Sequence, residues 1–225
     1  RVAATCFLQT GVFLPSATLD GMICDIIERL ERDYFPLCPG MVQRAFSSVA
    51  RSRRGLTDEE LMSLAGASRL LWSNFWWDCH DLLDGSQTLV NFHHPALDDQ
   101  VVARYMPTEE DRQKVTMQIA TYFENRPLTF RKAEEYPWCL AANAAFWVQT
   151  AQPSEYKHIW RRLKDTITNM DTFLILYCDE YVSDLHDYWH AMEGVYDPVD
   201  EYVSALEGHH GKSAMAGETE RIVPV

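Results

Sequence analysis

The chain has 225 residues, of which 47% are hydrophobic and 24% charged, a composition typical of a globular protein and not of a disordered tail. Its 33 acidic and 20 basic side chains give a net charge of -13, which disfavours nucleic-acid partners because phosphates repel it. No apolar run approaches the roughly 20 residues of a transmembrane helix, so we expect no membrane partner. Because residue 1 is Arg, we expect a piece of a longer polypeptide.

The negative charge is concentrated in one segment. Between Asp165 and Glu207 there are eleven acidic residues and neither Lys nor Arg, and the rest of the chain carries a net charge of only -2. Such a segment is typical of solvated outer faces of helices. It also predicts a surface that suits a basic protein partner.

The six cysteines predict a reducing, intracellular and cytoplasmic location. They are scattered along the chain without a C-x-x-C pair, and most have apolar or aromatic neighbours, as small buried hydrophobic residues do. A disulfide framework is typical of chains too short to build a core, and this chain is long enough to build one.

The first predicted element is an amphipathic helix in an N-terminal helical segment, residues 1–39. Its apolar positions, from Leu19 to Leu30, recur at intervals of three and four, and Pro36 and Pro39 end it. A second helix carries Val42, Phe46 and Val49 and ends in basic residues followed by glycine, the usual C-terminal signals.

Two further helices and one strand follow. Thr57 to Glu60 form a capping box that starts a short helix, and Ser68 caps a third helix that we expect to continue to Asp84. Residues 88–92, Thr-Leu-Val-Asn-Phe, are β-prone and bounded by turn residues, so they predict a strand.

After His94 the pattern is helical almost to the end. Apolar spacing predicts helices around residues 97–105, 109–123, 138–147, 154–163 and 170–188, with Ser154 as the cap of the fourth. Residues 208–225 are small and polar and are expected to form a loosely ordered tail. The predicted fold is therefore mainly α, with a winged-helix-like domain at 40–107 and an all-helical domain at 108–207.

A winged helix would enter the DNA major groove with its third helix. Here that helix, Ser68 to Asp84, has one Arg against three Asp and carries four aromatic residues. A basic cluster on the preceding helix, Arg44, Arg51, Arg53 and Arg54, is more typical of capping and solvation. We therefore expect packing against protein, and a stand-alone winged-helix regulator that binds nucleic acid stays as the alternative.

No pattern predicts an enzyme. The string Gly208 to Ser213 lacks the first glycine of a phosphate loop and the strand before it. His186 and His190 have the spacing of a zinc-protease helix, but no third ligand is indicated, which leaves a metallohydrolase as a third hypothesis. There is no G-x-S-x-G, and no cysteine has the surroundings of an activated thiol. We predict no catalytic residue, no metal and no cofactor in this chain.

Three groups of short strings follow one another along the chain: Arg54–Leu61; Phe92–His94 with Val101, Arg104 and Tyr105; and Ile119–Phe123 with Arg131, Glu134–Trp138 and Trp147. Taken in this order, they resemble the region after the ATPase core of STAND-class NACHT proteins, particularly the nephrocystin and telomerase-associated branches. The resemblance covers about Asp25 to Trp189, and Tyr136 stands where those proteins usually have Leu.

The resemblance implies a non-catalytic regulatory and protein-interaction module of a larger switch protein. In that family the ATPase lies upstream, and a histidine near the wing contacts the nucleotide phosphate in the closed state. His94 is the nearest match here, with His93 second, so the intact parent protein would bind ATP or ADP. The family also implies partner proteins and a cytoskeletal or ciliary assembly.

Overall fold

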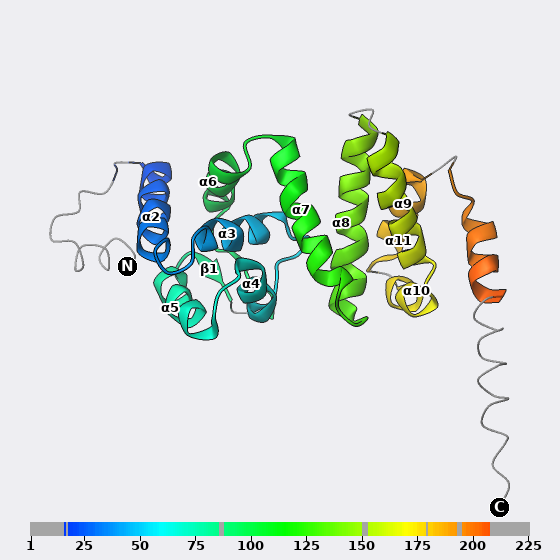
Figure 1. Cartoon of the computed structure of the whole chain (residues 1–225), viewed down its shortest axis with the longest axis horizontal. Helices are drawn as coiled ribbons and strands as arrows, with labels where there is room; N and C mark the ends of the chain where they lie inside the picture. The colour runs from blue at the N-terminus through cyan, green and yellow to red at the C-terminus, as the bar shows by residue number, and fades with distance from the viewer. Residues whose placement is uncertain are drawn as a thin grey trace, which may run out of the picture. The chain divides into compact units, whose positions relative to one another are not determined.

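The computed structural model describes residues 16, 18–85, 88–149, 153–178, 180–192 and 195–207. The described residues are mainly α-helical (Figure 1), which confirms the predicted fold class. The chain forms two compact units, Arg1–Tyr122 and Phe123–Val225. The string 208–213 and the tail predicted for 208–225 lie outside the described residues.

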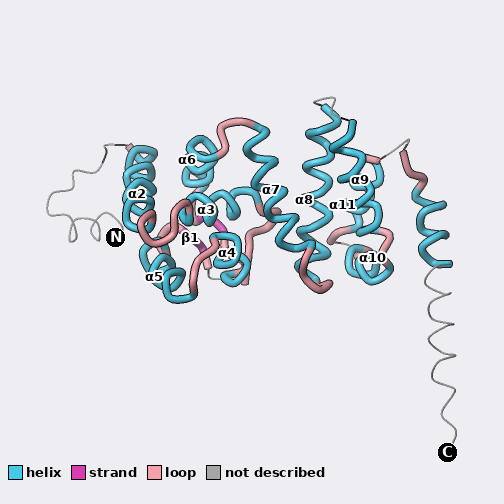
Figure 2. The backbone as a smooth tube through the Cα atoms, in the orientation of Figure 1, coloured by secondary structure: helices cyan, strands magenta, loops and turns pink. Residues whose placement is uncertain are grey.

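The first unit is a group of helices around a very small sheet (Figure 2). Two short strands pair antiparallel, with Leu83 opposite Phe92, and Leu56 bridges Val90 alongside them. In chain order the elements are α2 (Leu19–Tyr34), α3 (Met41–Arg51), α4 (Asp58–Ala65), α5 (Arg69–Cys79), β1 (Leu83–Asp84), β2 (Asn91–Phe92), α6 (Pro95–Tyr105) and most of α7 (Glu109–Glu124).

Local sequence signals set the helix boundaries of this unit. The Thr57 hydroxyl accepts the N–H of Glu60 at 3.2 Å while the Glu60 carboxylate accepts the N–H of Thr57 at 2.8 Å, which confirms the capping box. Ser68 accepts the N–H of Leu71 and caps α5, as predicted. Gly66, with φ of 68°, ends α4 in the left-handed conformation that glycine adopts most easily.

Aromatic rings form the core of the first unit. Phe46 and Phe75 are fully buried, with ring centroids 5.8 Å apart. Phe75 also packs edge-on against Tyr34 of α2, at 5.3 Å, and Phe46 packs against Phe92 of β2, at 5.9 Å. These contacts bring α2, α3, α5 and the sheet together around one centre, where each ring adds pairwise attraction to its buried area.

The third predicted helix was too long. It ends at Cys79, because Leu82 and its neighbours pair with the next segment: the N–H of His93 donates to the carbonyl of Leu82 at 3.0 Å, and Leu83 is buried in β1. The predicted strand is shorter than residues 88–92: β2 covers only Asn91–Phe92, and Val90 before it forms the isolated bridge to Leu56. The order helix, bridge, helix, helix and hairpin is the one that a winged helix requires, and the winged helix itself stays a prediction.

The second unit is built on the long helix α8 (Phe130–Gln149), which packs against α9 (Pro153–Ile167), α10 (Met170–Leu176) and α11 (Val182–Ala191). Residues 198–207 form a last helical segment. α9 begins at Pro153, one residue before the predicted cap. One prediction was wrong here: the run 170–188 is two helices, which separate after Leu176.

Buried charge stabilises the start of α8. Glu134 and Glu135 are 2% and 0% exposed, and the guanidinium of Arg131 pairs with both carboxylates. The hydroxyl of Tyr181, at the start of α11, donates to Glu134 at 3.0 Å. Because a buried carboxylate is costly unless it is paired, Arg131 is central to the stability of this unit.

In the part of the chain that the structure describes, no helix is both long and apolar enough to cross a membrane.

Candidate functional site

The two histidines predicted to contact a nucleotide lie between β2 and α6, and both are exposed. The Nδ1 atom of His94 accepts the N–H of Ala96 at 3.0 Å, so His94 is the N-cap of α6. A neutral imidazole that accepts at Nδ1 carries its proton on Nε2 and can donate it to a ligand. The backbone N–H of His93 donates to the carbonyl of Leu82.

The cap predicts how His94 variants behave. His94→Ala is expected to lower the free energy of unfolding by about 0.5–2 kcal/mol, the usual cost of losing an N-cap acceptor. His94→Asn keeps a short side-chain acceptor and should recover most of that loss. Urea denaturation followed by circular dichroism measures both variants. Equal losses in the two would contradict the capping role.

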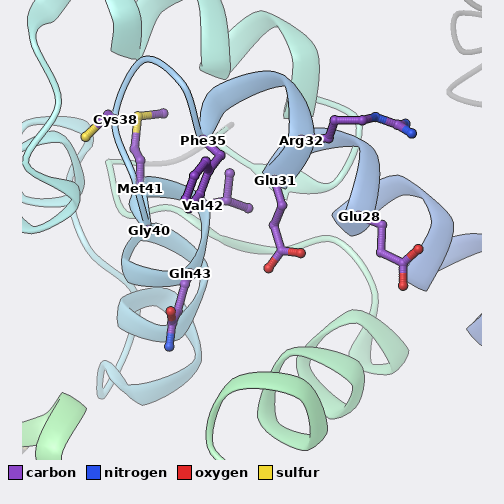
Figure 3. A pocket seen from close by; sticks show the side chains of 9 residues that line it. All are labelled: Glu28, Glu31, Arg32, Phe35, Cys38, Gly40, Met41, Val42 and Gln43. Atoms are coloured by element: carbon purple, nitrogen blue, oxygen red, sulfur yellow. The ribbon is translucent and has the colours of Figure 1, made fainter.

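A hollow of about 610 Å³ lies between the end of α2 and the start of α3 (Figure 3). Its lining combines carboxylates from α2 with apolar groups from Phe35, which follows α2, and from α3. The Cys38 thiol is the one sulfhydryl among the lining side chains, and its Sγ accepts from the guanidinium of Arg44 at 3.4 Å. The lining residues are Glu28, Glu31, Arg32, Phe35, Cys38, Gly40, Met41, Val42 and Gln43.

One wall of the hollow belongs to an ion-pair network between α2 and α6. Arg104 Nη2 lies 2.6 Å from Glu31 and Arg104 Nη1 lies 3.4 Å from Glu28, while the hydroxyl of Tyr105 donates to Glu31 at 2.5 Å. Burial favours the neutral form of Glu31, but the bonds from Arg104 and Tyr105 outweigh it and hold the pKa of Glu31 below its ordinary value. The contact therefore stabilises the fold near neutral pH, and this contribution is lost as the pH falls through the lowered pKa.

Arg44 joins the other wall to α4. Its guanidinium donates to the carbonyl of Pro39 at 3.0 Å and to that of Ala65 at 2.6 Å from Nη2. Arg104 and Arg44 thus bind other protein groups, and the lining of the hollow combines carboxylates and apolar groups with the guanidinium of Arg32. This arrangement can bind a surface of another protein. It does not place an acid, a base and a nucleophile together, as catalysis would require.

The third helix of the predicted winged helix, α5, presents apolar side chains to solvent. Leu70 and Trp77 are 76% and 71% exposed and lie two turns apart on one face.

Two groups at the end of α5 have no catalytic character. Asp78 accepts the hydroxyl of Tyr34 at 2.7 Å, and burial together with this hydrogen bond raises the pKa of Tyr34, so the phenol keeps its proton. Burial likewise raises the pKa of the Cys79 thiol, which makes it a poor nucleophile.

In the second unit, His186 and His190 are both exposed on α11, beside a hollow that Asp197 also lines. Across the described parts of the chain, no three His, Cys, Asp or Glu side chains gather closely enough to hold a metal ion.

The second unit also has an exposed apolar surface that the sequence did not lead us to expect. Valine and leucine side chains are exposed along residues 198–207, and their spacing of four and three was the available signal.

Comparisons with known proteins give one informative match. No protein-family model matches the chain, and no solved structure matches it significantly. A TPR repeat-containing protein of Dictyostelium discoideum is 26% identical to it over 172 residues, which are 75% of this chain and 10% of that protein. The chain thus spans about a tenth of the length of this relative, and the match establishes similarity to one part of it.

Proposed function

We propose that this chain is a non-catalytic helical module that binds other protein chains as part of a larger protein. The observation that carries the proposal is the acidic segment, residues 165–207, which has eleven carboxylates and no Lys or Arg. The nearest cation, Lys164, lies between Asp165 at 2.9 Å and Glu201 at 3.2 Å. A basic protein surface is the partner that this charge favours.

The similarity to a TPR repeat-containing protein supports a helical protein-interaction role. We also propose that the larger protein is of the STAND type. The element order of the first unit supports a winged helix there, and the exposure of His94 supports a contact with ATP or ADP held by an upstream domain. On this proposal the protein works in the cytoplasm, in a cytoskeletal or ciliary assembly.

Binding of nucleic acid by the winged helix is the second candidate, and the element order favours it. The exposed face of α5 argues against it. Leu70 and Trp77 are exposed on α5, and Arg69 is the one basic residue of that helix. Because affinity for DNA depends largely on the neutralisation of phosphates, this face is better suited to protein.

The test is carbodiimide cross-linking in cells of the source organism, which joins carboxylates to partner lysines without a spacer. We expect partner peptides attached to carboxylates of the acidic segment. A triple charge reversal, Asp187→Lys, Asp200→Lys and Glu207→Lys, should reduce these adducts at least about tenfold, because it replaces attraction by repulsion.

The control is a matched triple reversal of exposed carboxylates in the first unit, Asp20→Lys, Glu59→Lys and Asp99→Lys, which changes the net charge equally. It should leave the adducts unchanged. Equal losses in both variants, or adducts spread evenly over both units, would show that net charge alone attracts the partner and would defeat the proposal.

A further inference from the structure

We propose that residues 198–207 dock a basic amphipathic helix of a partner protein. This inference rests on the proposed function and names the surface and the chemistry of the partner. The surface is the outer row, which we define as Val199, Val203 and Leu206. They are 69%, 49% and 42% exposed. Because they are separated by four and three residues in a helix, they share one face.

The side of this helical segment that carries Glu201 and Tyr202 is fixed to the second unit. The Tyr202 ring lies 4.9 Å from the Phe173 ring and 5.4 Å from the Trp189 ring, and Trp189 Nε1 donates to the Tyr202 hydroxyl at 3.2 Å. Glu201 pairs with Lys164 on α9. The segment is therefore held by Glu201 and Tyr202, and this leaves the outer row uncovered.

An aromatic cluster borders the outer row. Leu206 follows Tyr202 by one helical turn, and Tyr202 contacts Phe173 of α10. The Phe173 ring stacks on that of Tyr177 at 5.1 Å, and Tyr177 is 64% exposed. Rigid aromatic side chains beside aliphatic ones are the groups that contribute most to binding at protein interfaces.

Charge complementarity decides the occupant. Asp200 and Glu207 are exposed and lie on the helix surface next to the outer row. Lys164 is already paired with carboxylates, so a partner meets net negative charge around an apolar row. An amphipathic helix whose apolar stripe is flanked by Lys or Arg fits both features. A second copy of this chain would place carboxylates against carboxylates, which disfavours self-association through this face.

The test uses a fluorescein-labelled helical peptide of roughly 18 residues, about five turns, made of Leu at helical spacing and Lys elsewhere. Anisotropy titration of the full chain gives its affinity. Val203→Asp is expected to weaken binding at least about tenfold, because it puts a charge in the centre of the apolar contact. Leu70→Asp, an equally polar change at an exposed site on α5, is the matched control and should leave the affinity unchanged. A peptide of the same composition with a central Pro should also bind at least about tenfold more weakly, because the helix is broken.

Three results would overturn the inference. One is equal binding by Val203→Asp and the unaltered chain. A second is equal binding of the helical and the Pro-containing peptides, which would mean that charge alone attracts them. A third is dimerisation of the chain that Val203→Asp abolishes, measured by light scattering. If circular dichroism shows that Val203→Asp is misfolded, Leu206→Ser answers the same question. If Val203→Asp binds the peptide as tightly as the unaltered chain does, and the carbodiimide cross-links to the acidic segment persist, this docking face is refuted and the proposed function is left intact.

Discussion

Arg131→Met is expected to lower the free energy of unfolding of the second unit by about 3–5 kcal/mol, the usual cost of removing one member of a buried ion pair. The substitution removes the cation that contacts both Glu134 and Glu135, two carboxylates with almost no exposed surface. Methionine fills most of the volume of the arginine side chain, so the loss of unfolding free energy comes from the missing charge and not from a cavity. Urea denaturation followed by circular dichroism measures it.

The control is Lys114→Met on α7, which removes a cation paired with Glu110 at the surface. Its side chain is 61% exposed, so stability should change little. Arg131→Lys should recover part of the loss, because it restores the charge without the planar fork that reaches two carboxylates. Comparable losses for Arg131→Met and Lys114→Met would contradict the importance of this buried cluster.

Gly55→Ala is expected to destabilise the first unit by at least about 2 kcal/mol, for two combined reasons. The φ of Gly55 is +101°, a region that L side chains rarely adopt, and an added Cβ would lie 2.6 Å from the Val90 carbonyl oxygen. That carbonyl accepts the N–H of Leu56 in the bridge beside the sheet. Because this contact is with a backbone oxygen, rotation of a side chain cannot relieve it, and the side-chain amide of Asn91, at 2.7 and 2.8 Å, would have to shift as well.

Gly66→Ala is the matched control. Gly66 also has a positive φ, +68°, but an added Cβ would meet only the Arg44 guanidinium, at 3.5 Å, which is ordinary contact. Its cost should be about 1 kcal/mol, the price of the left-handed conformation alone. Thermal denaturation of both variants compares them. If Gly66→Ala is as damaging as Gly55→Ala, the close approach at Val90 does not matter.

The parts of the fold that follow from local chemistry were predictable from the sequence. The Thr57 box and the Ser68 cap act within one helical turn, so their residues identify the starts of α4 and α5. The parts set by contacts distant in sequence were not. Leu83 looks like a continuation of α5, and only its pairing with Phe92 makes it a strand.

The candidate sites were predictable to different degrees. The resemblance singled out His94 and Arg104 by position. The structure adds that His94 caps α6 and that Arg104 pairs with Glu31, contacts that no spacing rule specifies. The helical spacing of the outer row can be seen in the sequence. Which face of that segment would be covered depended on the distant rings of Phe173 and Trp189.

The central claim is that this module binds basic protein surfaces and not nucleic acid. The most direct measurement titrates the full chain, at about 50 mM salt, against the labelled Leu/Lys peptide and against a labelled DNA duplex. We expect saturable binding to the peptide that weakens as salt rises, and no binding to the duplex at the same concentrations. Tight, salt-sensitive binding to the duplex would contradict it, because the acidic segment and the apolar face of α5 would then not govern what this chain binds.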